Sequence, residues 1–316
     1  MNNSVTLLFP GQGSQYVGMG QTLTNHPAAK IFTEADTALG FSLSSLMLSG
    51  PVETLQLTEH TQPAILTYSI ALFEKLKALL GEKSIKIERV LGHSVGEYAA
   101  LVVAQSISFA EAVQAVRLRG QFMQKAVPAG VGKMVAIMRV PQELIIQACQ
   151  AVSTPSNLVM PANFNEPNQI VISGAAEATD RAVEWLTENF EGRMRSIELK
   201  VSAPFHSSLM QPAADELAEA LNTCTIGENI YPYIANIDAT EYPVGTAQTI
   251  IKKNLIDQVA GSVQWTQSIL ALPSDTLCIE VGPGKVLAGL VKKINPDIKM
   301  ISLDTEGAFQ ELEKLL

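Results

Sequence analysis

The sequence predicts an α/β fold in which helices cover both faces of a mostly parallel sheet, with a smaller unit inserted into it. Apolar segments with the length of strands alternate with helical segments along most of the 316 residues, which is typical of a parallel sheet. Residues 131–201 interrupt this alternation with the order β-α-β-β-α-β, the ferredoxin-like pattern. Hydrophobic residues make up 47% of the chain and charged residues 17%, as in a globular protein with a large core.

The first predicted element is a strand, Val5–Phe9, which runs into the loop Pro10–Tyr16. The loop starts Gly-x-Gly, but Tyr16 stands where a dinucleotide-binding loop has its third glycine, and no P-loop lysine follows. Ligands bind beyond the carboxyl ends of strands in open α/β sheets. A functional role for Gln12 in this loop therefore competes on equal terms with a structural one.

Helices are predicted next, over residues 26–81, with breaks around Gly40 and at Gly50-Pro51. Gln62-Pro63 indicates the start of the longest one, Ala64–Leu80, because proline favours the first turn of a helix. The spacing of its apolar residues predicts an amphipathic helix that packs on the sheet.

A sharp turn between a strand and a helix is predicted at Gly92-His93-Ser94-Val95-Gly96. The strand before it is Ile87–Leu91, and the helix opens at Val95. In a Gly-x-Ser-x-Gly turn the serine hydroxyl projects into a cleft, and the glycines allow the close backbone contacts that the turn requires. Free N–H groups at the helix start can bind an oxyanion. The motif alone also occurs by chance, so the strand and the helix around it are what favour Ser94 as a nucleophile.

The next helix, predicted from Phe109 to about Ala126, carries Arg119 on its apolar face, whereas Arg117 points elsewhere. The residues that share this face are Ala112, Ala115, Val116, Phe122, Met123 and Ala126. A buried guanidinium is costly unless an anion meets it. Either its stem packs while its head reaches water or an internal glutamate, or the cation awaits a carboxylate that it can bind bidentately.

The remaining elements follow from the same patterns. In the insertion, strands are predicted at Met134–Val140, Leu158–Ala162, Gln169–Ser173 and Arg195–Val201, with helices at Pro141–Val152 and Ala175–Asn189. After it, strands are predicted at Tyr231–Ala235, Leu277–Val281 and Met300–Leu303. Four helices are predicted between and around them: one that ends near Leu221, one at Thr246–Val259, one that follows Thr266 and one that follows Gly284. Both joints of the insertion are expected near a cleft, because inserted units meet their host there.

Composition and charge argue against several classes of function. A net charge of −9 disfavours general binding of nucleic acids or anionic membranes. No apolar run approaches the ~18 residues of a membrane span, and the N-terminus shows no signal-peptide pattern. Cys149, Cys224 and Cys278 are far apart and indicate neither a disulfide framework nor a metal site, which fits a reducing cytoplasm.

A serine nucleophile needs a general base, and the chain has 4 histidines. His93 is expected to point away from the cleft, and His26 and His60 lie beside no other chemical signal. His206 stands at the second joint of the insertion and is the best candidate. No acidic residue between Ser94 and His206 has a recognisable local signal. A backbone carbonyl or an amide can orient the imidazole in place of a carboxylate, so the third member of the site stays open.

Taken together, these stretches resemble malonyl-CoA:acyl carrier protein transacylases and the acyltransferase domains of polyketide synthases over the whole chain. The matching stretches are Phe9–Gln15, Thr61–Ala64, Gly92–Tyr98, Arg119–Met123, Ala162–Asn165, Phe205–Ser207, Val263–Trp265 and Glu280–Lys285. The resemblance implies an α/β-hydrolase-like large subdomain, residues 1–130 and 202–316, with a ferredoxin-like insert at 131–201. It also implies a cytoplasmic enzyme that needs no metal and no cofactor.

The same resemblance implies an activity and the residues that perform it. Ser94 would take the malonyl group of malonyl-CoA as an ester and pass it to the phosphopantetheine thiol of an acyl carrier protein. His206 would act as general base, oriented by the main-chain carbonyl of Gln258. The main-chain N–H groups of Gln12 and Val95 would form the oxyanion hole.

The substrate-binding positions follow from the resemblance as well. Arg119 would pair with the malonyl carboxylate, and Phe205 would crowd an α-methyl branch of the acyl group. Met123 and Asn163 would complete the acyl-binding site. The resemblance leaves open whether the enzyme serves fatty-acid or polyketide synthesis.

Two other functions fit the same scaffold. One is a hydrolase that releases acyl groups from carrier proteins, but such an enzyme gains nothing from a buried cation. The other is a docking subunit without catalysis, which would not need Ser94. Because carrier proteins are acidic and so is this chain, a local basic patch is expected at the mouth of the cleft. The candidate residues are Arg193, Arg195, Lys200 and Lys285.

Overall fold

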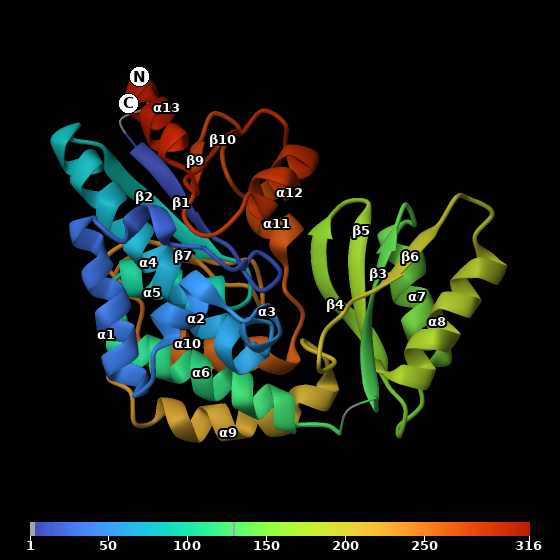
Figure 1. The fold of residues 1–316 in the computed structure, drawn as a ribbon. Coiled ribbons are helices and arrows are strands. Elements are labelled where there is room, and N and C mark those ends of the chain that lie inside the picture. Colours follow the sequence, from blue (N-terminus) through green and yellow to red (C-terminus); the bar gives the residue numbers. More distant parts are fainter. Residues whose placement is uncertain (1–3, 129) are drawn as a thin grey trace.

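The structure is a computed structural model, and it describes residues 4–128 and 130–316. Residues 1–3 and 129, which the predicted large subdomain includes, lie outside the described residues. Two sheets lie side by side, a six-stranded one on the left of Figure 1 and a four-stranded one on the right. The six strands have the order β10-β9-β1-β2-β7-β8, and all neighbours are parallel except β7 and β8. The predicted fold class is therefore confirmed.

The large sheet is buried on both faces. Its strands are β1 (Ser4–Phe9), β2 (Lys86–Gly92), β7 (Tyr233–Ile234), β8 (Glu241–Tyr242), β9 (Leu277–Glu280) and β10 (Lys299–Ser302). In β1 successive side chains point to opposite faces, so Leu7 and Phe9 join one hydrophobic core and Leu8 joins another. Because both faces are buried, the strand from Val5 to Phe9 is apolar except for Thr6, which is buried as well.

Helices form the two layers that cover this sheet. One layer contains α11 (Trp265–Leu270) and α12 (Val286–Ile294). The helices of the other core are α1 (Lys30–Leu39), α2 (Leu43–Ser49), α3 (Val52–Leu55), α4 (Thr58–Glu82), α5 (Gly96–Val103), α6 (Phe109–Lys125), α9 (Gln211–Leu221), α10 (Gln248–Ala260) and α13 (Glu306–Leu315). Three short 3₁₀ helices accompany them, η1 (Gln21–Leu23), η2 (Pro27–Ala29) and η3 (Ser208–Met210).

The predicted start of α4 is wrong. The helix begins at Thr58 instead of Ala64, and Pro63 lies inside it. Proline removes one helical hydrogen bond there, but the early turn packs closely on α6. A Cβ at Gly120 of α6 would lie 2.7 Å from the Cα of Glu59. This tertiary contact outweighs the local preference of proline for a first turn.

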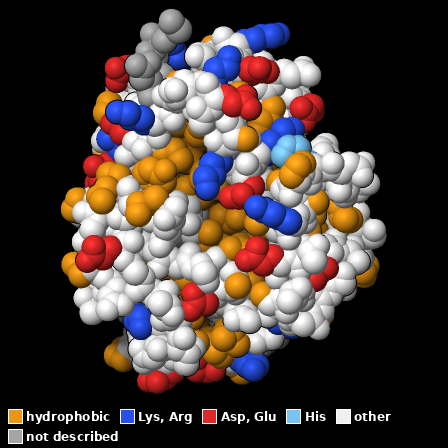
Figure 2. All heavy atoms as spheres, turned by 90° about the vertical axis from the view of Figure 1, so that its left-hand side faces the viewer, with side chains coloured by type: hydrophobic (Ala, Val, Ile, Leu, Met, Phe, Trp, Pro, Cys, Tyr) orange, Lys and Arg blue, Asp and Glu red, His pale blue; other side chains and the backbone are white. Residues whose placement is uncertain are grey.

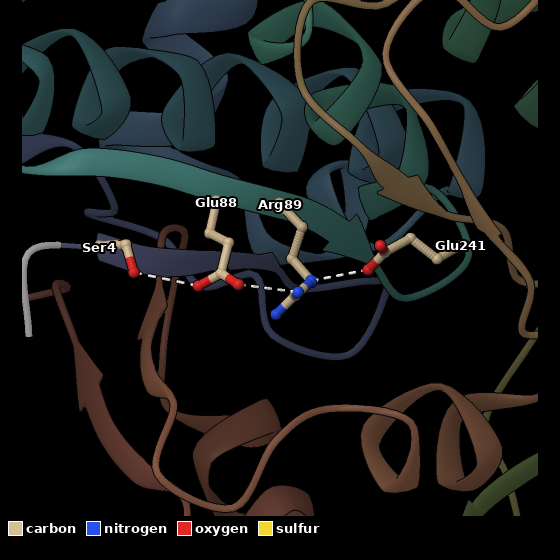
Figure 3. A network of polar contacts seen from close by, with 4 residues as sticks. All are labelled: Ser4, Glu88, Arg89 and Glu241. Carbon is tan, nitrogen blue, oxygen red and sulfur yellow. Dashed lines mark hydrogen bonds and ion pairs between the residues drawn. The ribbon is translucent and has the colours of Figure 1, made fainter.

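Three further differences lie in the C-terminal part. Strand β7 has two residues where five were predicted, and neither β8 nor α13 was predicted. The edge strand β8 also takes part in a polar network (Figure 3). The pairing of β2 with β1 skips Glu88, and this bulge lets Glu88 and Arg89 project to the same side. Glu88 accepts hydrogen bonds from Ser4 and Arg89, and Arg89 also donates to Glu241 of β8.

The inserted unit has the predicted β-α-β-β-α-β order. Its elements are β3 (Gly132–Met138), α7 (Gln142–Val152), β4 (Val159–Glu166), β5 (Gln169–Ala175), α8 (Ala176–Asn189) and β6 (Arg195–Glu198). The strand order is β4-β5-β3-β6, and all neighbours are antiparallel. Helices α7 and α8 cover one face, while Met134 and Val171 on the other face belong to the core of the large unit. We propose 131–201 as the limits of this unit.

The edge strand β4 fastens the inserted unit to the large one. The main-chain N–H of Phe164 donates to the oxygen of Val263 at 2.9 Å, and the N–H of Val263 donates to the oxygen of Ala162 at 2.8 Å. A parallel bridge joins Asn163 to Val263 between these two bonds. The insertion is thus held to the segment before α11 by main-chain pairing, and the exposed edge of β4 is covered.

Candidate active site

Ser94 occupies a strained turn between β2 and α5. Its φ of 52° lies in the left-handed region, which is uncommon for a residue with a side chain. A Cβ at Gly96 would lie 2.1 Å from the main-chain oxygen of Phe9, and one at Gly92 would lie 2.0 Å from the carbonyl carbon of Gly96. Only glycine fits at either position: Gly96 because the elbow packs against β1, and Gly92 because the turn folds back on its own backbone.

A histidine and a main-chain carbonyl complete a chain of hydrogen bonds from the serine. Ser94 Oγ lies 2.7 Å from Nε2 of His206, and Nδ1 of His206 lies 2.8 Å from the main-chain oxygen of Gln258. Because a carbonyl only accepts, Nδ1 carries the proton and Nε2 is left to accept the serine hydroxyl. Burial lowers the pKa of His206 to about 3, and the charge of Arg119 adds to the shift. The imidazole is therefore a neutral acceptor at physiological pH.

The two residues predicted for the oxyanion hole flank the serine. Gln12 follows the end of β1, and Val95 caps the N-terminus of α5. Neither main-chain N–H donates to another group in the described part of the chain. The side-chain oxygen of Gln12 accepts a 2.8 Å hydrogen bond from the hydroxyl of Thr58, which fixes the loop. Both N–H groups are thus free to bind an anionic oxygen.

The guanidinium of Arg119 lies next to the serine and is only 2% exposed. Its Nη1 donates to Gln62 Oε1 at 2.6 Å, and its Nη2 donates to Gln258 Oε1 at 2.8 Å and to Ser94 Oγ at 3.2 Å. Its Nε has no partner among the described residues. All these partners are neutral, so within the described residues the buried head makes no direct hydrogen bond to a glutamate. Of the two interpretations of the helical wheel, the geometry favours a cation that awaits an anion.

Arg117, two residues earlier in α6, is partly buried and lies away from the serine. Its guanidinium stacks on the ring of Phe41 at 4.3 Å and lies 4.0 Å from a carboxylate oxygen of Glu59. The helical spacing therefore separated the two arginines correctly.

A cavity of about 150 Å³ opens above Ser94, between the two units. The large unit contributes Gln12, Gln62, His93, Ser94, Val95, Arg119, Met123, Phe205 and His206. The inserted unit and its second joint contribute Met134, Asn163, Asn165, Val171, Leu199 and Val201. All the residues predicted for the site, except Gln258, line this one cavity, and Gln258 lies directly behind it.

His93 differs from its prediction in part. It was expected to point away from the cleft, but it is among the residues that line the cavity. Its Nε2 lies 2.9 Å from Oδ1 of Asn165, and its ring packs on Trp265 with 5.5 Å between centroids. His93 therefore connects the elbow to the inserted unit and does not reach the hydroxyl of Ser94.

Three polar residues at the site were given no role from the sequence. Asn236 Oδ1 accepts from the N–H of Ser94 at 2.7 Å, and its Nδ2 donates to the oxygen of Gly92 at 2.6 Å. Gln62 holds Arg119, and Glu97 lies below the serine. Asn236 follows the predicted strand 231–235, so its place at the carboxyl end of a strand was the available signal.

In residues 4–128 and 130–316, no three His, Cys, Asp or Glu side chains are grouped so as to hold a metal ion. Each helix in these ranges is too short or too polar to span a bilayer.

The sequence and the fold were compared with those of known proteins. The family described as acyl transferase domain matches residues 6–299. A malonyl CoA-acyl carrier protein transacylase of Bacillus subtilis is 48% identical over 305 residues, which cover 95% of this chain and 93% of that protein. One of Haemophilus influenzae is 40% identical over 314 residues and 98% of both chains.

Solved structures agree with these matches. The crystal structure of malonyl-CoA:acyl carrier protein transacylase from Xanthomonas oryzae has a TM-score of 0.91 and 38% identity, over 100% of this chain and 98% of that one. A malonyl-transacylase in complex with its type II polyketide synthase acyl-carrier protein has a TM-score of 0.92 and 35% identity, over 99% and 100%. The chain therefore belongs to the acyl transferase family, among the malonyl CoA-acyl carrier protein transacylases.

Proposed function

We propose that the protein transfers a malonyl group from malonyl-CoA to the phosphopantetheine thiol of an acyl carrier protein, through an ester on Ser94. The observation that carries this proposal is the position of Arg119. A buried guanidinium whose hydrogen-bond partners are all neutral lies 3.2 Å from the hydroxyl of a serine that is paired with a neutral histidine. Such a site fits an acyl group that ends in a carboxylate.

In the first half of the reaction, Ser94 Oγ attacks the thioester carbonyl while Nε2 of His206 takes its proton. The oxyanion that forms accepts hydrogen bonds from the N–H groups of Gln12 and Val95. One such donor typically contributes about 2.7–4 kcal/mol to the transition state. When the tetrahedral intermediate collapses, the C–S bond breaks, and His206 returns the proton to the sulfur of CoA. The malonyl group then remains on Ser94 as an ester.

The second half of the reaction repeats these steps in reverse. The thiol of the carrier protein gives its proton to His206, and its sulfur attacks the ester carbonyl. The C–O bond to Ser94 breaks, and the imidazole returns the proton to Oγ. The carbonyl of Gln258 holds the imidazole in one tautomer throughout and stabilises the imidazolium that forms twice.

The acyl site is closed by side chains that match the malonyl group in size and polarity. Phe205 is buried beside His206 and is proposed to crowd an α-methyl branch. Met123 packs on Gln62, whose amide nitrogen lies 3.8 Å from the sulfur. We assign Met123 and Asn163 to the walls of this site. The proposed steps need no metal and no cofactor, and we place the enzyme in the cytoplasm.

Intact mass after mixing with acyl-CoA thioesters tests the proposal. Malonyl-CoA should add one malonyl group to the protein, and Ser94→Ala should abolish the mass shift. Addition of an acyl carrier protein that carries phosphopantetheine should then remove the group from the enzyme and add it to the carrier. Release of free malonate in place of carrier acylation would support the hydrolase, and no mass shift at all would support a docking subunit.

A further inference from the structure

Glu97 is a glutamate buried at 0% exposure, directly below the elbow that carries Ser94. It lies in the first turn of α5, three residues after the serine. The mechanism proposed above gives it no task. A carboxylate is rarely buried without a partner of opposite charge, so its contacts need an explanation.

One oxygen of Glu97 is fully used and the other is not. Oε2 accepts from Nε2 of Gln258 at 2.6 Å and from the main-chain N–H of Asn236 at 3.1 Å. Oε1 is buried and has no partner among the described residues. Glu97 is therefore held by two donors on one side and lacks a donor on the other.

The amide of Gln258 connects Glu97 to Arg119. Its Nε2 donates to Glu97, and its Oε1 accepts from Nη2 of Arg119 at 2.8 Å. The amide dipole thus has its positive end on the carboxylate and its negative end on the guanidinium. Glu97 is thus separated from Arg119 by one amide group, and when it is ionised its charge stabilises the charged guanidinium.

No other titratable group around Glu97 in the described part of the chain compensates the charge of Arg119. Tyr98 lies on the same helix and Tyr233 lies on β7. Burial raises the pKa of both phenols above their usual range, so neither carries a charge near pH 7. Asp238, in the loop after β7, is exposed and accepts a hydrogen bond from Tyr242. His206 is neutral, as argued above. Arg119 is the one cation that acts on Glu97 in the described part of the chain.

We propose that Glu97 is a positioning residue that sets specificity: its carboxylate and that of the malonyl group compete for the charge of Arg119. This inference rests on the proposed function and deepens it. When a malonyl carboxylate pairs with Arg119, the buried site holds two anions and one cation. Because the second anion is unfavourable in a buried site, Glu97 takes up a proton as the malonyl group binds.

The direction of the pH dependence follows from this competition. Burial raises the pKa of Glu97 to about 7, with the hydrogen bonds and Arg119 partly opposing the shift. Below that pH Glu97 is neutral and Arg119 is open to the substrate carboxylate. Above it, Glu97 is ionised and must be protonated before the malonyl group binds well. An acetyl group has no carboxylate and is free of this requirement.

The test compares kcat/KM for malonyl-CoA and acetyl-CoA across the range around pH 7, because kcat/KM reports ionisations of the free enzyme. Effects that both substrates share cancel in the ratio of the two values. In the wild-type protein the malonyl-to-acetyl ratio should fall with rising pH, by about fivefold or more. A ratio that stays constant would overturn the inference.

Glu97→Gln isolates the charge from the hydrogen bonds. A glutamine oxygen at the position of Oε2 keeps both donors, and its NH₂ takes the position of Oε1, which has no partner. The variant should lose the pH dependence of the ratio and keep the high malonyl-to-acetyl ratio of the wild type at low pH. A purely structural role would leave the pH dependence in place and lower both values together.

Glu280→Gln is the matched control. Glu280 is also buried at 0% exposure, but it lies at the end of β9 and accepts from the N–H groups of Leu287 and Ala288 at the start of α12. This variant should keep the wild-type pH dependence of the malonyl-to-acetyl ratio. If Glu280→Gln also abolished that pH dependence, the role of Glu97 would not be specific. If Glu97→Gln fails to fold, measuring proton uptake by the wild-type protein tests the inference instead. Near pH 7, weakly buffered solution with a pH indicator should show uptake with malonyl-CoA and none with acetyl-CoA.

Failure of this inference and failure of the proposed function are distinguishable. If intact mass shows no malonyl group on Ser94, the proposed transfer itself is wrong. If Ser94 is acylated by malonyl-CoA but the ratio is independent of pH, only the role of Glu97 is wrong.

Discussion

Arg119 Nη2 lies 3.2 Å from Ser94 Oγ, so the cation that we propose to select the acyl group contacts the atom that we propose to react with it. The serine oxygen accepts this hydrogen bond while its own proton points to His206. A substrate carboxylate that pairs with Arg119 is therefore placed within a few bonds of the nucleophile. The short reach between carboxylate and carbonyl in a malonyl group suits this arrangement.

Arg119→Ala should abolish most malonyl transfer and affect acetyl transfer much less. Loss of one partner of a buried charge pair costs about 2–5 kcal/mol, so kcat/KM for malonyl-CoA should fall by roughly 30- to 5,000-fold. The measurement is kcat/KM with both acyl-CoA substrates.

Arg117→Ala is the matched control for that variant, because it removes the same side chain from the outer face of the same helix. It should change both values little, since its contacts are to Phe41 and Glu59 at the surface. An equal loss for malonyl-CoA and acetyl-CoA in Arg119→Ala would instead mean that Arg119 only supports the fold.

The general base should remain active well into the acid range. Because the pKa of His206 is lowered to about 3, the imidazole stays neutral in the free enzyme as the pH falls from 7 to about 5. Acylation of Ser94 by p-nitrophenyl acetate, an uncharged ester, should be nearly constant over this range. A fall in rate with a midpoint near 6.5 would show that the histidine is not shielded as the structure implies.

The same shift makes a stability prediction. Folding favours the neutral form of His206, so its contribution to the free energy of unfolding is complete above pH ~6.5 and is lost as the pH falls towards 3. His206→Gln should remove this part of the acid sensitivity in urea unfolding at a series of pH values. An unchanged slope between those two pH values would contradict the assignment.

The elbow should tolerate no methyl group. In Gly96→Ala the new Cβ would meet the main-chain oxygen of Phe9, which cannot move without shifting β1. Overpacking of this kind costs about 1–3 kcal/mol, measured as the free energy of unfolding. Gly289→Ala is the control, because a Cβ there meets nothing within 4 Å and alanine favours the helix α12. Equal effects of the two substitutions would refute the steric argument.

The sequence was sufficient for the fold where local pattern and tertiary structure agree. Strand β1 and most elements of the insertion follow from hydrophobic periodicity, because one or both of their faces are buried; β6 is an exception, since all its residues are exposed. The start of α4 was mispredicted because the contact of Gly120 with Glu59 joins residues from two helices. Strand β8 has only two residues and depends on its pairing with β7. For α13 a local signal existed, because Thr305 caps its N-terminus through a hydrogen bond from the N–H of Ala308.

The site residues that could be predicted are those that belong to a sequence motif or to a residue type that is rare in this chain. Ser94 has a motif, and His206 was found because the chain has 4 histidines. Asn236, by contrast, lies 142 positions from the serine whose N–H it binds, and its place after a predicted strand indicates only that it lies near the site, not that contact. The buried network of Glu97 and Gln258 exists only in the folded protein, for the same reason.

The last prediction concerns the carrier protein, whose acidic surface needs a basic one at the cleft. Figure 2 shows the side of the large unit away from the inserted sheet, where basic and acidic side chains are intermixed and neither forms a continuous field. Lys200 is exposed between Leu199 and Val201, which line the cavity. Lys285 is exposed beside Gly284, which lies close to Ser14 of the loop that contains Gln12. These two lysines are therefore the best-placed members of the predicted patch.

Lys200→Glu combined with Lys285→Glu should slow transfer from the malonyl-enzyme to the carrier protein by about tenfold at low salt, with less effect at high salt. The second half-reaction is measured alone, on enzyme already carrying the malonyl group, because CoA is itself anionic. Pantetheine, an uncharged thiol, serves as the matched acceptor and should react at an unchanged rate.

Arg193→Glu with Arg195→Glu is the control pair. Arg195 pairs with Met138 at one end of β3, whereas Pro204, next to the joint, lies against Gly132 at the other end. The arginine pair should therefore slow transfer less than the lysine pair does. If neither pair alters transfer to the carrier protein, its docking surface lies on another face.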